Sequence, residues 1–370
     1  MNFVMKRALI LSGIYWNEPF QRHQQFAYYL NRMGYEVYFL ERIMSSKFSV
    51  LKFWDVIGRK LQKSAEYSNL KVNNELPKGV VPIDYRFINP EDGIFKIYNT
   101  RKINKFIAEY GNKFDVIINY LPINTTRMII ERLNYNFLVY DCVRNFSGWG
   151  SYRKDILNEE KALIERSDIV FTDSFFLTDY MKQYNKQTIQ FLPIANKRWI
   201  EGCQQKKIQR IKHFAYFGSV EKHIDIKILM DLAQKGFVIH IWGIRGVDLE
   251  FDHIDHGYES DLKKLSFQIT SVADAIILPY RGNMDGVIPA KLLQCLSTYM
   301  PIYINEFYDS CYLKDYLYVY TDFQDLISLI NSYNDSDEET RRDKIRIFLE
   351  DKDEMSQYDR FKKTFEQWPN

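Results

Sequence analysis

The chain has few cysteines, no paired cysteine motif and no long apolar run. Without a C-x-x-C pair, neither a zinc ribbon nor a disulfide framework is indicated. No run approaches the ~18 apolar residues of a membrane span. The apolar run near residue 8 has about five residues, fewer than the roughly 7–15 of a signal-peptide core. We therefore expect a cytoplasmic protein. Its four cysteines are scattered at Cys142, Cys203, Cys295 and Cys311.

Composition and length describe an ordinary soluble protein with two domains. The hydrophobic share of 46% and the charged share of 26% exclude collagen-like and disordered classes, and 370 residues favour two domains over one. The net charge of +2 hides an asymmetry. Residues 1–200 hold 29 basic and 20 acidic residues, a net +9, whereas residues 201–370 hold 21 and 28, a net −7. This asymmetry indicates that the first half meets an anionic partner.

Strand and helix patterns alternate along the chain in two series. Residues 7–14 predict a buried strand, a helix with apolar side chains at helical spacing follows, and residues 36–40 predict a second strand. Such a unit implies a parallel sheet. The pattern continues with predicted strands at 115–120, 137–141, 169–172, 190–192, 213–217, 237–242, 275–278 and 301–305.

These series predict an α/β protein with two Rossmann-like parallel-sheet domains facing across a cleft, where open α/β sheets bind ligands. We expect an amino-terminal domain at 1–197, a linker at 198–212 and a carboxy-terminal domain at 213–345. A final helix at 346–370 is expected to pack back toward the amino-terminal domain.

Phosphate-binding features are expected in the second domain. The first strand is followed by Gly13 alone rather than G-x-G-x-x-G, and no Walker P-loop is present. After the apolar strand 277–280 come Arg281 and the small-residue segment around Gly286, then a helix predicted from near residue 289 that carries Lys291. Backbone N–H groups, the positive helix end and two cations suit a diphosphate without a metal. The alternative for Lys291 is a solvated helix lysine.

This segment resembles the carboxy-terminal signature of GT-B nucleotide-sugar glycosyltransferases of the bacterial surface-polysaccharide type, which include capsule, O-antigen and exopolysaccharide enzymes. The family pattern is a strand ending in LPY, a loop and a P-x-K-x-x-E-x-L-A-x-G-x-P helix, matched here from Pro289 to Pro301. Together the matches extend in order from residue 7 to about residue 305. The other matching segments are QRHQQFAYYLNRMGYEVYFLE (21–41), YDCVRNF (140–146), DIVFTDS (168–174), YFGSVEKHIDIKIL (216–229) and HGYES (256–260).

The resemblance implies a GT-B architecture and the transfer of a sugar from a nucleoside-diphosphate sugar, with UDP favoured, without a metal or other cofactor. The acceptor is expected to be a glycan, such as one linked to polyprenyl diphosphate, in surface polysaccharide biosynthesis; no nucleic acid is expected. The amino-terminal domain would bind the acceptor and the carboxy-terminal domain the donor. The donor-binding residues that follow are Gly218, Lys222, His256, Tyr258, Arg281, Gly286, Lys291 and Gln294.

Catalysis requires positive charge on the leaving diphosphate, expected from Lys291, Arg281 and Lys222. An inverting enzyme also needs a base near the acceptor hydroxyl. Asp141, at the end of a strand, is the first candidate and His23 the second. Asp141 is equally well explained as a turn or helix cap, and His23 as a residue lining the first helix. A retaining enzyme needs neither as a base, so the stereochemistry stays open.

Three positions depart from the family pattern. Gln294 replaces the glutamate that accepts bonds from the ribose hydroxyls, Tyr299 replaces a small glycine, and Arg144 replaces the second aspartate of Y-D-C-x-D. These departures favour a second hypothesis, in which the chain is a catalytically weak or inactive glycosyltransferase-like binding or partner protein. A metal site is not expected at His253 and His256, because their H-x-x-H spacing has no third ligand nearby.

Residues 42–63 form a basic segment with an apolar side. Phe48, Leu51, Trp54, Ile57 and Leu61 are spaced to share roughly one helical face. A basic helix of this kind is typical of the surface of an anionic membrane, and the alternative is a helix packed on its own domain. We expect peripheral association with the cytoplasmic membrane face, involving Lys52, Trp54, Arg59 and Lys60. The six basic residues of the segment are Arg42, Lys47, Lys52, Arg59, Lys60 and Lys63.

Overall fold

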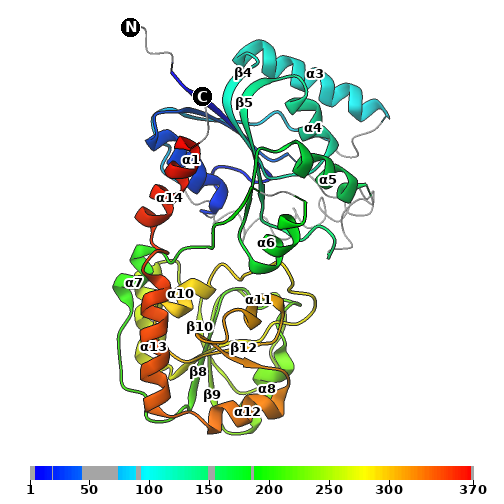
Figure 1. Cartoon of the computed structure of the whole chain (residues 1–370). Helices are drawn as coiled ribbons and strands as arrows, with labels where there is room; N and C mark the ends of the chain where they lie inside the picture. The colour runs from blue at the N-terminus through cyan, green and yellow to red at the C-terminus, as the bar shows by residue number, and fades with distance from the viewer. Residues whose placement is uncertain are drawn as a thin grey trace. The chain divides into compact units, whose positions relative to one another are not determined.

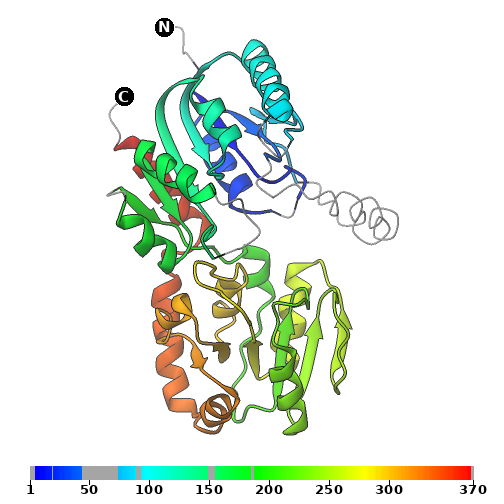
Figure 2. The same ribbon diagram turned by 90° about the vertical axis from the view of Figure 1, so that its right-hand side faces the viewer.

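The computed structural model describes residues 5–18, 20–43, 74–88, 93–148, 155–184 and 187–367, and its elements can be followed in Figures 1 and 2. The chain divides into two compact units. Unit 1 consists of Met1–Thr172, Leu177–Phe191 and Tyr358–Asn370. Unit 2 consists of Asp173–Phe176 and Leu192–Gln357.

Unit 1 contains a seven-stranded parallel sheet with the order β3-β2-β1-β4-β5-β6-β7. The order reverses beside β1, which pairs with both β2 and β4. The strands are β1 (Arg7–Leu11), β2 (Glu36–Leu40), β3 (Val80–Ile83), β4 (Lys113–Asn119), β5 (Asn134–Cys142), β6 (Ile169–Thr172) and β7 (Thr188–Gln190). The helices are α1 (Arg22–Arg32), α3 (Gly93–Tyr110), α4 (Asn124–Ile130), α5 (Ile156–Arg166), α6 (Phe175–Lys182) and α14 (Glu354–Glu366), of which α6 and α14 begin in unit 2.

Unit 2 contains a six-stranded parallel sheet with the order β10-β9-β8-β11-β12-β13. Its order reverses beside β8, which pairs with β9 and β11. The strands are β8 (His213–Phe217), β9 (Val238–Trp242), β10 (Ile254–Gly257), β11 (Ala275–Leu278), β12 (Ile302–Asn305) and β13 (Tyr318–Tyr320). The helices are α7 (Lys197–Gly202), α8 (Ile226–Gln234), α9 (Leu262–Val272), α10 (Leu292–Leu296), α11 (Tyr308–Cys311), α12 (Phe323–Asn331) and α13 (Asp335–Leu349).

The central strands of both sheets are buried on both faces, which explains their apolar sequences. In β11 all four residues, AIIL, are fully buried, and four of the five residues of β1 are buried. Parallel strands covered on both faces read as continuous apolar runs rather than as alternating patterns. The short edge strand β10, IDHG, is mostly exposed and lacks such a run, and for this reason the sequence pattern did not predict it.

Side-chain caps fix the start of several helices in unit 2. The Asp225 carboxylate accepts from the backbone N–H of Lys227 at the start of α8, and Asp261 accepts from two N–H groups at the start of α9. Asn334 caps α13 in the same way. Each cap satisfies backbone donors that have no partner within the helix and contributes about 1 kcal/mol.

The segment 198–212, expected to be a linker, is packed into unit 2. Helix α7 lies against α9, and the indole of Trp199 is fully buried in the core of the unit. Its Nε1 donates to the backbone carbonyl of Gln294 at 2.7 Å. The change from one unit to the next therefore occurs at Phe191–Leu192, before this segment begins.

Helix α14 completes the core of unit 1, where it lies beside α1 (Figure 1). The ring of Phe361 is fully buried, with its centroid 4.7 Å from that of Phe26 and 4.6 Å from that of Phe365. The guanidinium of Arg32 lies over the ring of Tyr358 at 4.0 Å. The first and the last described helices of the chain thus share one aromatic cluster.

Candidate functional site

The candidate residues gather where the strand order of each sheet reverses. Open α/β sheets bind ligands at the carboxyl ends of their strands at such points. In unit 2 this point lies after β8 and β11, and in unit 1 it lies after β1 and β4.

Lys291 lies at the reversal point of unit 2 within a group of aromatic rings. Its ammonium donates to the backbone carbonyl of Phe217 at 2.5 Å and lies 4.2 Å from the ring centroid of Tyr216 and 5.7 Å from that of Tyr280. We call Tyr216, Phe217, Tyr280 and Lys291 the Lys291 cluster. Burial lowers the pKa of Lys291 to about 8. Among the described residues no carboxylate forms an ion pair with it, so the cluster holds a positive charge without a counter-charge.

Two glycines keep the space beside Lys291 open. Gly218, directly after β8, has a φ of +111°, and a Cβ there would lie 2.9 Å from the Lys291 Nζ. Gly243, directly after β9, would place a Cβ 2.1 Å from the carbonyl oxygen of Gly218. Side chains at either position are excluded, so the backbone beside Lys291 stays uncovered, while the N–H groups of Gly218 and Gly243 donate to the carbonyls of Trp242 and Gly257, both at 2.8 Å.

Arg281 and Lys222 are exposed on neighbouring loops at the same edge. The Arg281 Nε donates to the carbonyl oxygen of Lys222 at 2.7 Å, which joins the two loops. Gly286 is buried, and its N–H donates to the carboxylate of Asp309 at 3.2 Å. That carboxylate also accepts from the N–H groups of Phe175 and Phe176 at 2.6 and 3.2 Å. Asp309, which the sequence analysis did not single out, therefore fixes the Gly286 loop.

The helix after this loop differs from the sequence prediction. It was expected to begin near Pro289, whereas α10 begins at Leu292 and contains five residues, with Lys291 as its N-cap. A helix of this length has a small aligned dipole. Positive charge at this edge therefore comes from the side chains of Lys291, Arg281 and Lys222 rather than from the helix.

His256 and Tyr258 lie at the carboxyl end of β10, two strands from β8 and therefore about 10 Å along the edge. The His256 ring stacks on the indole of Trp242, with centroids 4.0 Å apart and planes within 5°. Tyr258 is 56% exposed. Together these side chains present exposed planar surfaces at a fixed distance from the Lys291 cluster.

Gln294 lies on α10, one turn after Lys291, and is half-buried. Its backbone carbonyl accepts from the Trp199 indole and from the Ser297 hydroxyl, at 2.7 and 2.8 Å. Its side-chain amide forms no hydrogen bond with the described residues. The amide is therefore available to a ligand.

His23 lies at the reversal point of unit 1. Its Nδ1 is 3.0 Å from the Ser12 hydroxyl, and its ring stacks on Tyr120 with centroids 3.6 Å apart. Burial, and then the charges of Arg144 and Arg22, lower the pKa of His23 to about 3, so the ring is neutral at neutral pH. Its Nε2 forms no hydrogen bond with the described residues.

Asp141, the other candidate base, is fully buried at the end of β5 and paired with Arg22. The Arg22 Nε donates to both carboxylate oxygens, at 3.0 and 2.7 Å, and this guanidinium also donates to the carbonyl of Phe191. Proton transfer to Asp141 would require this ion pair to separate. The structure thus brings both candidates to the same edge of the sheet. His23 is a neutral ring whose Nε2 forms no hydrogen bond with the described residues, whereas Asp141 is held in an ion pair with Arg22.

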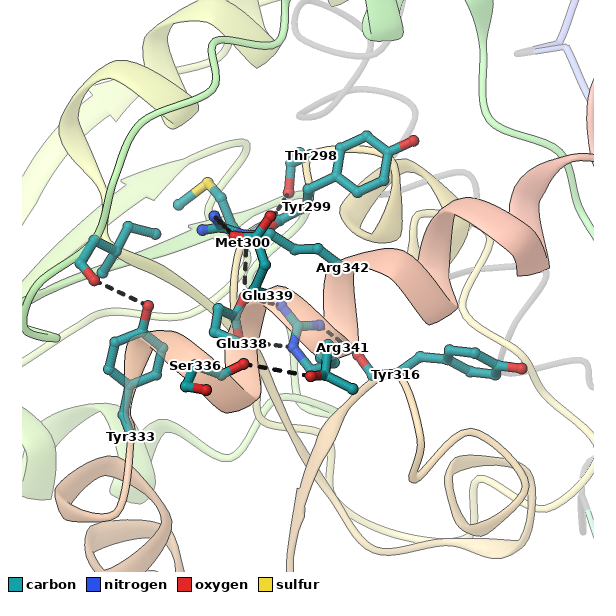
Figure 3. A network of polar contacts seen from close by, with 12 residues as sticks. Thr298, Tyr299, Met300, Tyr316, Tyr333, Ser336, Glu338, Glu339, Arg341 and Arg342 are labelled. Atoms are coloured by element: carbon teal, nitrogen blue, oxygen red, sulfur yellow. Dashed lines mark hydrogen bonds and ion pairs between the residues drawn. The ribbon is translucent and has the colours of Figure 1, made fainter.

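The backbone at Tyr299 has the conformation that suits the glycine expected from the resemblance. Tyr299 has a φ of +55°, in the left-handed region that favours glycine. The Nε of Arg342 donates to its carbonyl oxygen at 3.1 Å, and Arg342 lies 3.6 Å from the fully buried carboxylate of Glu338 (Figure 3). Glu338 also binds Arg341 and accepts from the Tyr318 hydroxyl at 3.0 Å. The left-handed turn at Tyr299 is therefore held by a contact from α13.

Some sequence predictions lie outside the residues that the structure describes. The basic segment 42–63 is described only at Arg42 and Ile43, so its helix is not among the described elements. Within the described residues, no helix is long and apolar enough to cross a membrane.

No family model matches the sequence, and no curated protein sequence matches it. Solved structures do match. The Anabaena HepE protein, in crystals with UDP and with UDP-glucose, has 11% identity and TM-scores of 0.63 and 0.62; the matches cover 98% of this chain and 100% of that chain. The chain has the GT-B fold.

Two further GT-B structures match over nearly the whole chain. Sucrose-phosphate synthase from Thermosynechococcus elongatus has a TM-score of 0.62 at 11% identity and covers 98% of this chain and 99% of that chain. Trehalose 6-phosphate synthase from Burkholderia multivorans has a TM-score of 0.59 at 9% identity, with 98% and 96% covered. These matches and the two parallel sheets confirm the fold class expected from the sequence.

Sequence reasoning missed several residues of the site. The aromatic partners of Lys291, Tyr216 and Tyr280, belong to the matching segments YFG and LPY, but nothing in the sequence indicates that their rings meet. The Arg22 partner of Asp141 lies 119 positions away. His240 lies 3.0 Å from His256. The only sequence feature that could have singled it out is that it is the one polar residue in the apolar strand VIHIW.

Proposed function

We propose that this protein is a glycosyltransferase that moves a sugar from a nucleoside-diphosphate sugar, with a UDP-sugar favoured, to a glycan acceptor. The observation that carries the proposal is Lys291, a half-buried ammonium without a carboxylate partner among the described residues, at the reversal point of a GT-B sheet. An anionic ligand supplies the missing counter-charge. The UDP and UDP-glucose complexes of HepE support this class of ligand.

In this proposal the residues of unit 2 bind the donor. Lys291, Arg281 and Lys222 neutralise the diphosphate, whose negative charge grows as the glycosidic bond breaks, without a metal or other cofactor. Gly218 and Gly286, which have no side chains, leave room for the phosphates beside the backbone, and Gln294 binds the ribose hydroxyls. His256 and Tyr258 contact the base.

Residues of unit 1 bind the acceptor hydroxyl. The hydroxyl oxygen attacks the anomeric carbon, the bond from that carbon to the phosphate oxygen breaks, and the nucleoside diphosphate leaves with the bonding electrons. The hydroxyl proton passes to a base in an inverting reaction, or to the leaving phosphate in a retaining one. His23, with its unoccupied Nε2, is better suited to accept a hydrogen bond from the hydroxyl than the paired Asp141.

The acceptor in this proposal is a lipid-linked glycan of surface polysaccharide biosynthesis, such as a capsule. The support is the sequence resemblance and the basic segment 42–63, which would bind the anionic face of the cytoplasmic membrane. Wild-type protein should sediment with vesicles that contain anionic lipid. Replacing Lys52, Arg59 and Lys60 together by Gln should abolish the sedimentation; unchanged sedimentation would refute the electrostatic part of this proposal.

The decisive experiment measures nucleotide binding by calorimetry with UDP, GDP, CMP and UDP-sugars, with and without EDTA. We expect UDP to bind in both conditions, and Lys291→Met to weaken its Kd by about 10-fold or more, because charge-assisted hydrogen bonds contribute about 1.5–3 kcal/mol. The matched control is Lys235→Met, an exposed lysine at the end of α8. No binding by any nucleotide would contradict the proposal.

A second candidate function is a catalytically weak glycosyltransferase-like binding or partner protein. The ion pair that occupies Asp141 and the low basicity of His23 favour it, together with the amide of Gln294. UDP-sugar binding with neither transfer nor slow donor hydrolysis would identify this alternative. Turnover that Lys291→Met abolishes would exclude it.

A further inference from the structure

Three histidines from neighbouring strands of unit 2 form a continuous row of hydrogen-bonded rings, which we call the histidine row. The Nδ1 of His213 lies 3.0 Å from the Nε2 of His240, and the Nδ1 of His240 lies 3.0 Å from the Nε2 of His256. The rings come from β8, β9 and β10. The two contacts use opposite nitrogens of His240, so the rings form a line. The described residues contain no cluster of three ligating side chains that could hold a metal ion.

The position of one proton in the histidine row fixes the others. A neutral imidazole carries one proton, and each contact between two rings holds one proton. If His213 donates to His240, then His240 donates to His256, and the outer Nδ1 of His256 must carry its proton. If the order is reversed, the outer Nδ1 of His256 is bare. The proton position at His213 and the donor or acceptor state of this nitrogen are therefore coupled through His240.

The central ring is suited to remain neutral. His240 is 5% exposed, and burial, followed by the charges of His256 and His213, lowers its pKa to about 4. Burial also lowers the pKa of His256. Four charged groups face the row. Asp274 and Lys206, which lie 3.4 Å apart, act on His240, while Asp255 acts on His256 and is paired with Arg245 at 2.6 Å.

The row ends at His256, on the edge of the sheet at which we place the nucleobase. The His256 ring is exposed, rests on Trp242 and has no hydrogen bond from its Nδ1 to a described residue. Nucleobases present fixed patterns of donors and acceptors, so the state of one facing nitrogen discriminates among them. The ring thus has an oriented face for stacking and one free edge atom.

We propose that His213 and His240 are positioning residues that set the tautomer of His256 and thereby the hydrogen bond it offers to the base of a nucleoside diphosphate. This inference rests on the proposed function. His213 is two rings away from that base, so its effect passes through His240. The row makes base recognition a property of three residues on three strands.

The first test is nitrogen-15 NMR of the ligand-free full chain, because protonated and bare ring nitrogens have separate shifts. We expect one tautomer of His256 in the wild type and a mixture of both in His213→Phe and in His240→Phe, which keep an aromatic ring but remove both nitrogens. The control is His253→Phe, on the same segment but outside the row, where it contacts Arg245 and Phe251. A mixed tautomer in the wild type, or an unchanged one in His213→Phe, would overturn the inference.

The second test is the Kd for UDP of the same proteins. His213→Phe and His240→Phe should weaken it by about 3- to 10-fold, the contribution of one oriented hydrogen bond, and His253→Phe should not. An equal Kd in all four proteins would overturn the inference and leave the proposed function standing. No UDP binding by the wild type would overturn the proposed function, while the NMR result would still decide whether the row sets the tautomer.

Discussion

The charge on Lys291 changes within the pH range in which the protein can be assayed. Its pKa is lowered to about 8 by burial, and a diphosphate binds the ammonium form. We therefore expect the Kd for UDP to be constant below about pH 8 and to weaken by up to about tenfold per pH unit above it. Calorimetry between pH 7 and 9.5 measures this. Lys291→Arg stays charged and should show no such dependence; a wild-type Kd that does not change above pH 8 would contradict the assignment.

Glu160 makes the stability of unit 1 depend on pH. Its side chain is 3% exposed, and burial raises its pKa to about 7 from 4.5, although the hydroxyl of Tyr140 donates to it at 2.6 Å. The stability gained by holding this proton is present below pH 4.5 and is lost as the pH rises through 7. Glu160→Gln keeps the oxygen acceptor without the charge, so it should exceed the wild type by about 3 kcal/mol at pH 8 and by little at pH 4.5.

Urea unfolding of both proteins at these two pH values measures the Glu160 effect. The matched control is Glu165→Gln, an exposed residue on the same helix α5, for which we expect no such difference. A gain of equal size at both pH values in Glu160→Gln would show that packing rather than protonation is responsible.

At the scale of elements, the turn after α10 is a place where glycine should stabilise the protein more than alanine does, the opposite of the usual preference inside a helix. Tyr299 has a φ of +55°, and its carbonyl is held by Arg342 of α13. Tyr299→Gly and Tyr299→Ala lose the same ring, but only glycine adopts this backbone without strain. We expect the glycine variant to be the more stable by about 1 kcal/mol, as measured by denaturant unfolding.

An exposed helix position provides the opposite comparison. At Thr340, in the interior of α13, alanine should be more stable than glycine by about 1 kcal/mol. If alanine were also the better residue at position 299, the left-handed backbone there would not favour glycine.

At the scale of the whole molecule, the sequence was sufficient for the fold class and insufficient for the contacts of the site. The apolar strands 7–11 and 275–278 could be predicted because both faces of each are buried. The edge strand β10 could not, because its residues are mostly exposed and carry no apolar pattern. Lys291 could be proposed from its motif, but its aromatic neighbours and the Arg22–Asp141 pair depend on residues distant in sequence.

The aromatic cluster formed by α1 and α14 lies within unit 1. We therefore expect that a mutation in this cluster destabilises unit 1 and not unit 2. Phe361→Ala removes a fully buried ring of unit 1 and should lower its stability by about 3–5 kcal/mol. Calorimetry should show the unfolding transition of unit 1 moving down while that of unit 2 stays. The control is Lys362→Ala on the same helix, which should move neither. A common shift of both transitions would mean that the units unfold as one.

The path of the chain through helix α14 has a consequence for protein synthesis. Unit 2 is made of Asp173–Phe176 and Leu192–Gln357, so all of it has been translated when the ribosome reaches Tyr358. Phe361 and Phe365, which pack against each other, follow only then, and Phe361 contacts Phe26. Domains generally fold in the order in which they are synthesised. Unit 1, although its synthesis begins earlier, therefore completes its aromatic cluster only after every residue of unit 2 has been synthesised.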